Sequence, residues 1–180
     1  MGVSLSQHVF APTLPEISRP GKRTPPDQEQ LIRLLRDSDS ATRTLAAWTG
    51  GAVRLELVSR DDDRLRQDEY ADLDVWQPVP VQRRVVRLLD SDGRTLSEAT
   101  ATVVLGRLPY QTVRELREGD APLGLLLSPL HVRRHTLSIL RGDRTGEDRD
   151  GVLFDVTARM DVAGRPVAFV RERYLMEALP

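Results

Sequence analysis

The sequence of 180 residues contains no cysteine, and its single lysine is Lys22. The lack of cysteine excludes a disulfide scaffold, a thiolate metal site and a cysteine nucleophile. Because Lys22 lies in a proline-rich N-terminal stretch, Schiff-base chemistry is not expected. No apolar run approaches the ~20 residues that span a bilayer, and nothing resembles a signal peptide. We therefore expect a cytoplasmic protein with no membrane partner.

An excess of one charge is also missing, since 26 basic side chains are balanced by 27 acidic ones. Nucleic acid or an anionic membrane would require a basic excess, so neither is expected as a partner. The sequence has no phosphate-binding glycine loop, no GxSxG motif and no histidine pair with metal-binding spacing. We expect no metal and no cofactor. His131 and His135 are interpreted as polar residues on one face of a strand.

The length fits one domain, which we expect to be a monomer or a homodimer. Prolines are frequent up to Pro26 and predict a poorly ordered arm over residues 1–24, followed by a domain over 25–180. Apolar residues at helical spacing in 31–35 predict a first helix. A second is predicted over 41–48, with Asp39 or Ser40 as its cap and Gly50 at its end.

After this helical hairpin, the hydrophobic period changes to two residues, which is typical of strands. A charged, aperiodic stretch at 61–74 is expected to be a long loop with at most one helical turn, and Pro109 is expected to open a crossover helix that ends at Gly119. The predicted strands cover 53–57, 82–89, 95–105, 131–140, 153–162 and 166–175. This order predicts an α+β fold with a single antiparallel sheet of about six strands.

Two charged side chains lie on apolar faces of predicted strands. Arg84 shares its face with Val86 and Leu88, and Glu172 shares its face with Tyr174. Charges that face a core are costly unless they are paired or lie in a cavity. The pattern therefore leaves two explanations open, namely a structural ion pair or a cavity in which the arginine binds an anion and the carboxylate meets a proton or hydroxyl.

Four stretches, in order, resemble the chorismate lyase family, the chorismate pyruvate-lyases that make 4-hydroxybenzoate. The first is LLRDSDSATR at 34–43, in the helical hairpin, and the second is RVVRL at 84–88. The third is PLG at 122–124, and the fourth is GRP at 164–166 followed by ERYL at 172–175. Together they span nearly the whole predicted domain.

The resemblance implies a six-stranded antiparallel sheet whose helices enclose an internal ligand cavity, with no cofactor. It implies a carbon–oxygen lyase that eliminates pyruvate from chorismate to give 4-hydroxybenzoate or a related aromatic acid. Arg84 then binds the substrate carboxylate together with the amide of Leu123, and Glu172 is the catalytic residue at the hydroxyl or ether end. Ala41 is the flap residue, and Arg134 is a further candidate for substrate binding.

One departure from the family keeps other functions open. Val156 and Thr157 stand where lyases usually carry an arginine pair. The same fold could therefore act as a cyclase or tailoring enzyme in polyketide-type metabolism. A third alternative is a non-catalytic small-molecule-binding module, a role that related folds have beside DNA-binding domains, although no helix-turn-helix precedes this one. In each case the expected partner is a small molecule, most simply a carboxylate.

Overall fold

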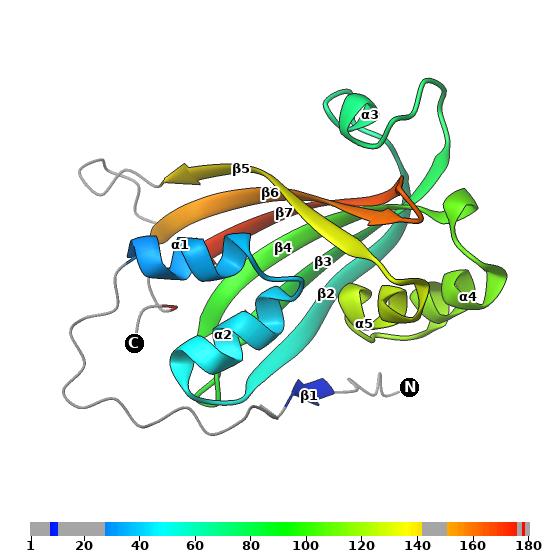
Figure 1. The fold of residues 1–180 in the computed structure, drawn as a ribbon. Coiled ribbons are helices and arrows are strands. Elements are labelled where there is room, and N and C mark those ends of the chain that lie inside the picture. The colour runs from blue at the N-terminus through cyan, green and yellow to red at the C-terminus, as the bar shows by residue number, and fades with distance from the viewer. Residues whose placement is uncertain (1–7, 11–27, 142–150, 176–177, 179–180) are drawn as a thin grey trace.

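The computed structural model describes residues 8–10, 28–141, 151–175 and 178 (Figure 1). Its strands form one antiparallel sheet in the order β1-β2-β3-β4-β7-β6-β5. The strands are β1 His8–Phe10, β2 Val53–Arg64, β3 Pro80–Leu89, β4 Thr95–Val104, β5 Arg133–Arg141, β6 Val152–Val162 and β7 Arg165–Leu175. The predicted α+β class is confirmed, with six long strands and the three-residue β1 at one edge.

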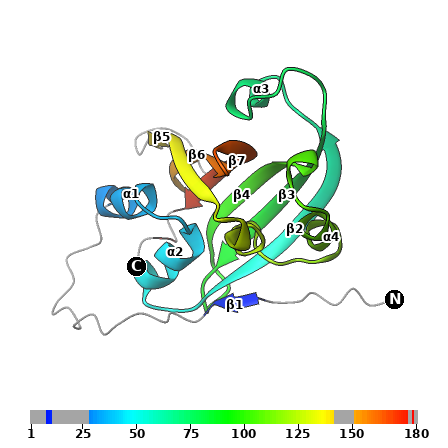
Figure 2. The same ribbon diagram turned by 45° about the vertical axis from the view of Figure 1, so that its right-hand side comes forward.

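Most of the helices cover one face of this sheet, which we call the helical face (Figures 1 and 2). At one end of it lies the hairpin of α1 and α2, and at the other lie α4 and α5, which connect β4 to β5 across the sheet. The short helix α3 packs on the opposite face. The helices are α1 Gln28–Arg36, α2 Ala41–Thr49, α3 Glu69–Asp72, α4 Tyr110–Glu118 and α5 Leu123–Leu127, with 3-10 turns η1 Leu105–Arg107 and η2 Ser128–Leu130.

The helical hairpin has the caps expected from its sequence. Ser40 is extended at φ −146° and its side chain accepts the N–H of Arg43, as an N-cap does. Gly50 ends α2 in the left-handed conformation at φ 71°. Leu31 and Leu45 are fully buried against the sheet, so the hairpin is held by an apolar stripe from each helix.

Two local predictions were wrong. The charged stretch after Arg60 continues strand β2 to Arg64, because Asp61 and Asp63 pair with β3 and the carboxylate of Asp63 binds Arg83. These tertiary contacts override the low strand propensity of aspartate. His131 lies outside β5, in a left-handed conformation at φ 53°, so it does not share a strand face with His135.

The helical face carries two separate apolar clusters. One packs α1 and α2 against strand residues such as Leu88 and Phe154, and the other packs α4 and α5 against residues such as Val103 and Ala168. A third cluster, which includes Leu73 and Phe169, holds the α3 segment on the opposite face. The gap between the first two clusters is where polar side chains gather.

The boundary of the predicted arm stays a prediction. His8–Phe10 pair with β2, and the remainder of residues 1–24 lies outside the described residues. Within the part of the chain that the structure describes, no helix is long and apolar enough to cross a membrane.

Candidate functional site

A pocket of about 450 Å³ lies on the helical face between the two apolar clusters. Its floor is formed by β3, β4 and β7, and its walls by the first residues of α2, the turn into α5 and the start of β5. All five residues predicted from the sequence line this pocket: Ala41, Arg84, Leu123, Arg134 and Glu172. Their roles in binding stay predictions, whereas their convergence on one pocket is a property of the fold.

At one end of the pocket the buried guanidinium of Arg84, only 1% exposed, caps helix α4. Its Nη1 donates to the carbonyl oxygen of Leu116 at 2.9 Å, and its Nη2 donates to that of Ala121 at 3.0 Å. Burial and, to a smaller extent, the nearby charge of Arg60 lower the pKa of Arg84 to about 10. The side chain is thus still cationic at neutral pH, and the hydrogen bonds it makes to described residues end on neutral carbonyls.

At the other end, Glu172 is held by two donors on the same oxygen. Nη2 of Arg134 donates to Oε2 at 2.7 Å, and the hydroxyl of Tyr174 donates to Oε2 at 2.8 Å. Arg134 is fixed in turn by the Thr136 hydroxyl at 3.0 Å. The ring of Tyr174 stacks on Phe154 with centroids 4.8 Å apart. Burial, together with the charge of Glu172, raises the pKa of Tyr174 well above its ordinary value, so its hydroxyl remains a donor.

The sheet register sets the distance between the two ends. Arg84 lies opposite Ala101 on β4, and Glu172 lies opposite Ala99 on the same strand. The two residues are therefore two strands and two positions apart, or about 12 Å between Cα atoms. Small side chains at Ala99 and Ala101, with Val170, leave the floor between them apolar and open. A ligand that touches both ends has the size of a small metabolite.

These contacts exclude one of the two explanations for Arg84 and Glu172, whereas the binding of an anion in the cavity stays a prediction. The two residues do not form an ion pair with each other, because Glu172 pairs with Arg134 and Arg84 donates to carbonyls. Sequence reasoning missed the part played by Tyr174, which follows from its place two residues after Glu172 on the same strand face. It also missed Arg60, because residues near 61–74 were expected to be a loop.

The pocket has no evident metal-binding set. Within the described ranges, no group of three or more His, Asp or Glu side chains is arranged to hold a metal ion. The ionisable side chains of the pocket lining are the exposed Asp39 and Arg43 and the less exposed Arg84, Arg134, Glu172 and Tyr174.

No family model matches the sequence, and no curated protein matches it. Solved structures do match. PhnF from Mycobacterium smegmatis is 18% identical with a TM-score of 0.60, over 78% of this chain and 65% of that one. The effector domain of PhnF alone is 18% identical with a TM-score of 0.59, over 77% of this chain and 89% of that domain. The ligand-binding domain of a GntR-family transcriptional regulator from Bordetella bronchiseptica is 16% identical with a TM-score of 0.54, over 72% and 86%.

At these identities the likeness shows a shared fold. This chain spans about 65% of the length of full PhnF but 89% of its effector domain, so the common part is the effector domain. One of these structures is named as an effector domain and one as the ligand-binding domain of a GntR-family transcriptional regulator, and none of the three is named as a lyase.

The assignment to the chorismate lyase family is therefore wrong, and the predicted pyruvate elimination, the 4-hydroxybenzoate product and the enzyme class fall with it. The motifs that suggested it lie in the α1–α2 hairpin, in strand β3, at the start of α5, and at the β6–β7 turn and the end of β7, which are features that specify a fold and not a reaction. The geometry of Glu172 agrees with this correction, because its carboxylate is engaged as an acceptor by Arg134 and Tyr174.

Proposed function

We propose that this chain is a non-catalytic ligand-binding domain that senses a small anionic molecule in the pocket on its helical face. The observation that carries the proposal is the buried charge of Arg84 at one end of a pocket of about 450 Å³. The likeness to the effector domain of PhnF and to a GntR-family ligand-binding domain supports a regulatory role of this kind.

Arg84 has donors to spare for a ligand. The guanidinium group carries five N–H donors, and the two bonds to Leu116 and Ala121 occupy two of them. A buried cation is costly unless anions compensate it, so a ligand carboxylate or similar anion is stabilised there by charge-assisted, bidentate hydrogen bonds. The other end favours a hydrogen-bond donor, because Glu172 presents a carboxylate that Arg134 already orients.

These contacts favour a ligand that carries one anionic group and one hydroxyl or amide donor. The two groups should be less than about 12 Å apart, because that is the spacing of Arg84 and Glu172. The apolar floor between the ends suits a compact apolar body. The predicted amide contact of Leu123 and the wall contact of Ala41 belong to this proposal, since both residues line the same pocket. The expected absence of nucleic acid as a direct partner, the cytoplasmic location and the monomeric or homodimeric state remain predictions.

The test is a binding experiment with a matched pair of probes, benzoate and benzamide, which differ mainly in charge. Benzoate at millimolar concentration should raise the melting temperature of the protein, whereas benzamide should not, because a ligand that binds only the folded state stabilises it. Arg84→Met should weaken benzoate binding at least about tenfold in calorimetry, since a charge-assisted contact contributes about 1.5 kcal/mol or more.

Arg87→Met is the control, because it removes an exposed arginine of the same strand whose partner is Glu98 on the opposite face. It should leave benzoate affinity unchanged. The proposal is overturned if benzoate and benzamide stabilise the wild-type protein equally, or if Arg84→Met binds benzoate as well as Arg87→Met does.

A further inference from the structure

A second arginine stands directly behind the anion-binding end of the pocket. Arg60 on β2 lies opposite Arg84 in the antiparallel register of β2 and β3. It is not among the residues that line the pocket. Its Nη1 donates to the carbonyl oxygens of Leu116, at 3.3 Å, and Gly119. Arg60 and Arg84 therefore share the carbonyl of Leu116 as an acceptor.

The end of helix α4 explains how two cations can lie so close together. Leu116 belongs to the last turn of α4, and Gly119 is its C-cap. The carbonyls of a helix C-terminus carry a partial negative charge, which stabilises cations near them. The two guanidinium groups thus converge on the one part of the helix that favours positive charge. The negative charge of Asp120, in the next turn, acts on Arg84 in the same favourable direction.

The charge of Arg60 reaches the pocket through Arg84. It lowers the pKa of Arg84, second only to burial, which shows that the two groups interact electrostatically. Burial disfavours any charge at this place, but the positive charge of Arg60, which destabilises a cation there, stabilises an anion by the same Coulomb interaction. The turn that Arg60 fixes, at Gly119, leads within three residues to Pro122 on the pocket wall.

We propose that Arg60 is a positioning residue of the anion-binding end, which acts from outside the pocket through its charge and through the end of helix α4. It holds the carbonyl that also orients Arg84, and it adds a second positive charge to the field that a bound anion meets. This inference rests on the proposed function, because it assigns a further determinant to the same site.

A Coulomb interaction is proportional to the charge of the ligand, so the charge of Arg60 should affect a dianion more than a monoanion. With a separation of roughly 8 Å and an effective dielectric constant of about 40, one positive charge strengthens binding of a monoanion about fivefold. For a dianion the same charge strengthens binding about 25-fold. A purely structural role of Arg60 would weaken both anions by the same factor.

The experiment measures the affinities of sulfate and methanesulfonate, a dianion and a monoanion of similar shape, by calorimetry at constant ionic strength. Arg60→Gln should weaken methanesulfonate about fivefold and sulfate about 25-fold. Arg60→Lys keeps the charge and should keep the ratio of the two affinities within about twofold of the wild-type ratio. Arg87→Gln removes the same charge from the opposite face and should change neither affinity.

Asp120→Asn should change the affinities in the opposite direction, and it can be measured even if Arg60→Gln fails to fold. Removing this negative charge beside Arg84 should strengthen sulfate binding more than methanesulfonate binding. The role of Arg60 would be overturned if Arg60→Gln weakened the affinities for both anions equally or not at all, or if Asp120→Asn left the ratio of the two affinities unchanged. In each of these cases, binding of the anions to the wild-type protein would still support the proposed function. If neither sulfate nor methanesulfonate binds the wild-type protein, the anion-binding end itself is overturned, and this inference with it.

Discussion

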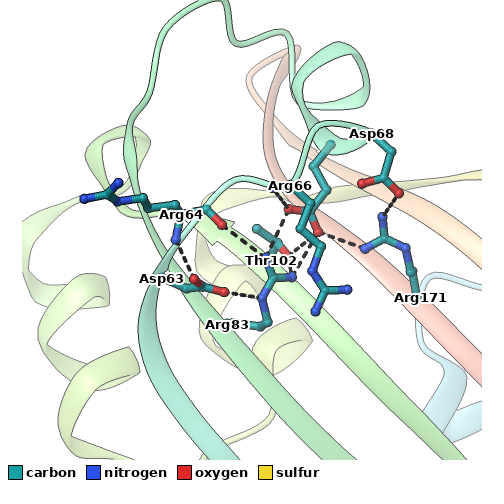
Figure 3. Close-up of polar contacts among 8 residues, drawn as sticks. Asp63, Arg64, Arg66, Asp68, Arg83, Thr102 and Arg171 are labelled. Atoms are coloured by element: carbon teal, nitrogen blue, oxygen red, sulfur yellow. Dashed lines mark hydrogen bonds and ion pairs between the residues drawn. The ribbon is translucent and has the colours of Figure 1, made fainter.

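The opposite face of the sheet carries a buried ion network whose stability contribution can be calculated from its contacts (Figure 3). Glu69, the first residue of α3, is fully buried. Its carboxylate accepts hydrogen bonds from Arg83 at 3.0 and 3.2 Å, from Thr102 at 2.8 Å, from Arg171 at 2.8 Å and from the backbone of Arg66 at 2.9 Å. The network clamps the α3 segment onto β3, β4 and β7.

These contacts fix the pKa of Glu69. Burial raises it, but the hydrogen bonds from Arg83, Arg66, Arg171 and Thr102 outweigh burial and lower the pKa from 4.5 to about 2. This difference corresponds to about 3 kcal/mol of folding stability at neutral pH. Because the folded-state pKa is the lower one, the stabilisation is complete above about pH 5 and is lost as the pH falls toward about 2.

We therefore expect Glu69→Gln to lower the free energy of unfolding by about 3 kcal/mol at pH 7, measured by urea denaturation. At pH 3 the difference between variant and wild type should shrink to about 1 kcal/mol, because part of the wild-type stabilisation is already gone. The control is Asp68→Asn, which removes an exposed partner of the same Arg171 and should cost less than about 1 kcal/mol. A Glu69→Gln effect as small as that of Asp68→Asn, or one that is the same at pH 7 and pH 3, would refute the reasoning.

Three further predictions concern the polar end of the pocket and its wall. Arg134→Met should cost about 3 kcal/mol in urea denaturation because it leaves the largely buried carboxylate of Glu172 without its arginine partner, and Glu172→Leu in the same chain should restore most of the loss. Tyr174→Phe should cost about 1 kcal/mol. In an alkaline absorbance titration the wild-type protein should show one tyrosine that ionises only on unfolding, and this step should be absent from Tyr174→Phe. Ser40→Ala should cost about 1 kcal/mol in urea denaturation by removing the cap of α2, and an unchanged stability would contradict the capping role.

Short sequence motifs predicted the helices and strands, because caps, turns and strand alternation depend on residues that are close in the sequence. The cap at Ser40 and the helix end at Gly50 both follow from short motifs. The alternation of side chains along a strand also predicted that Glu172 shares a face with Tyr174, and both side chains line the pocket.

The partners of the charged residues could not be predicted in this way. Arg134 reaches Glu172 because β5 lies beside β6, at the sheet edge two strands from β7, and that order is set by the whole sheet. Arg60 was missed because strand pairing with β3 overrides the low strand propensity of the charged stretch that follows it. The family assignment failed for a related reason, since motifs that set turns and caps are shared by proteins with different functions.

The two faces of the sheet show why buried charge alone does not identify a binding site. Arg83 and Arg84 are neighbours on β3, and Arg171 and Glu172 are neighbours on β7, so each pair sends one side chain to each face. On the face of α3, Arg83 meets the carboxylate of Glu69, which has a donor for nearly every lone pair. On the helical face, Arg84 meets only carbonyls among its described hydrogen bonds, and a pocket lies beside it. The carboxylate of Glu69 compensates Arg83 within the protein, whereas the described hydrogen bonds of Arg84 end on neutral carbonyls beside a pocket, and this difference, which strand alternation cannot reveal, supports the proposal that a ligand binds on the helical face.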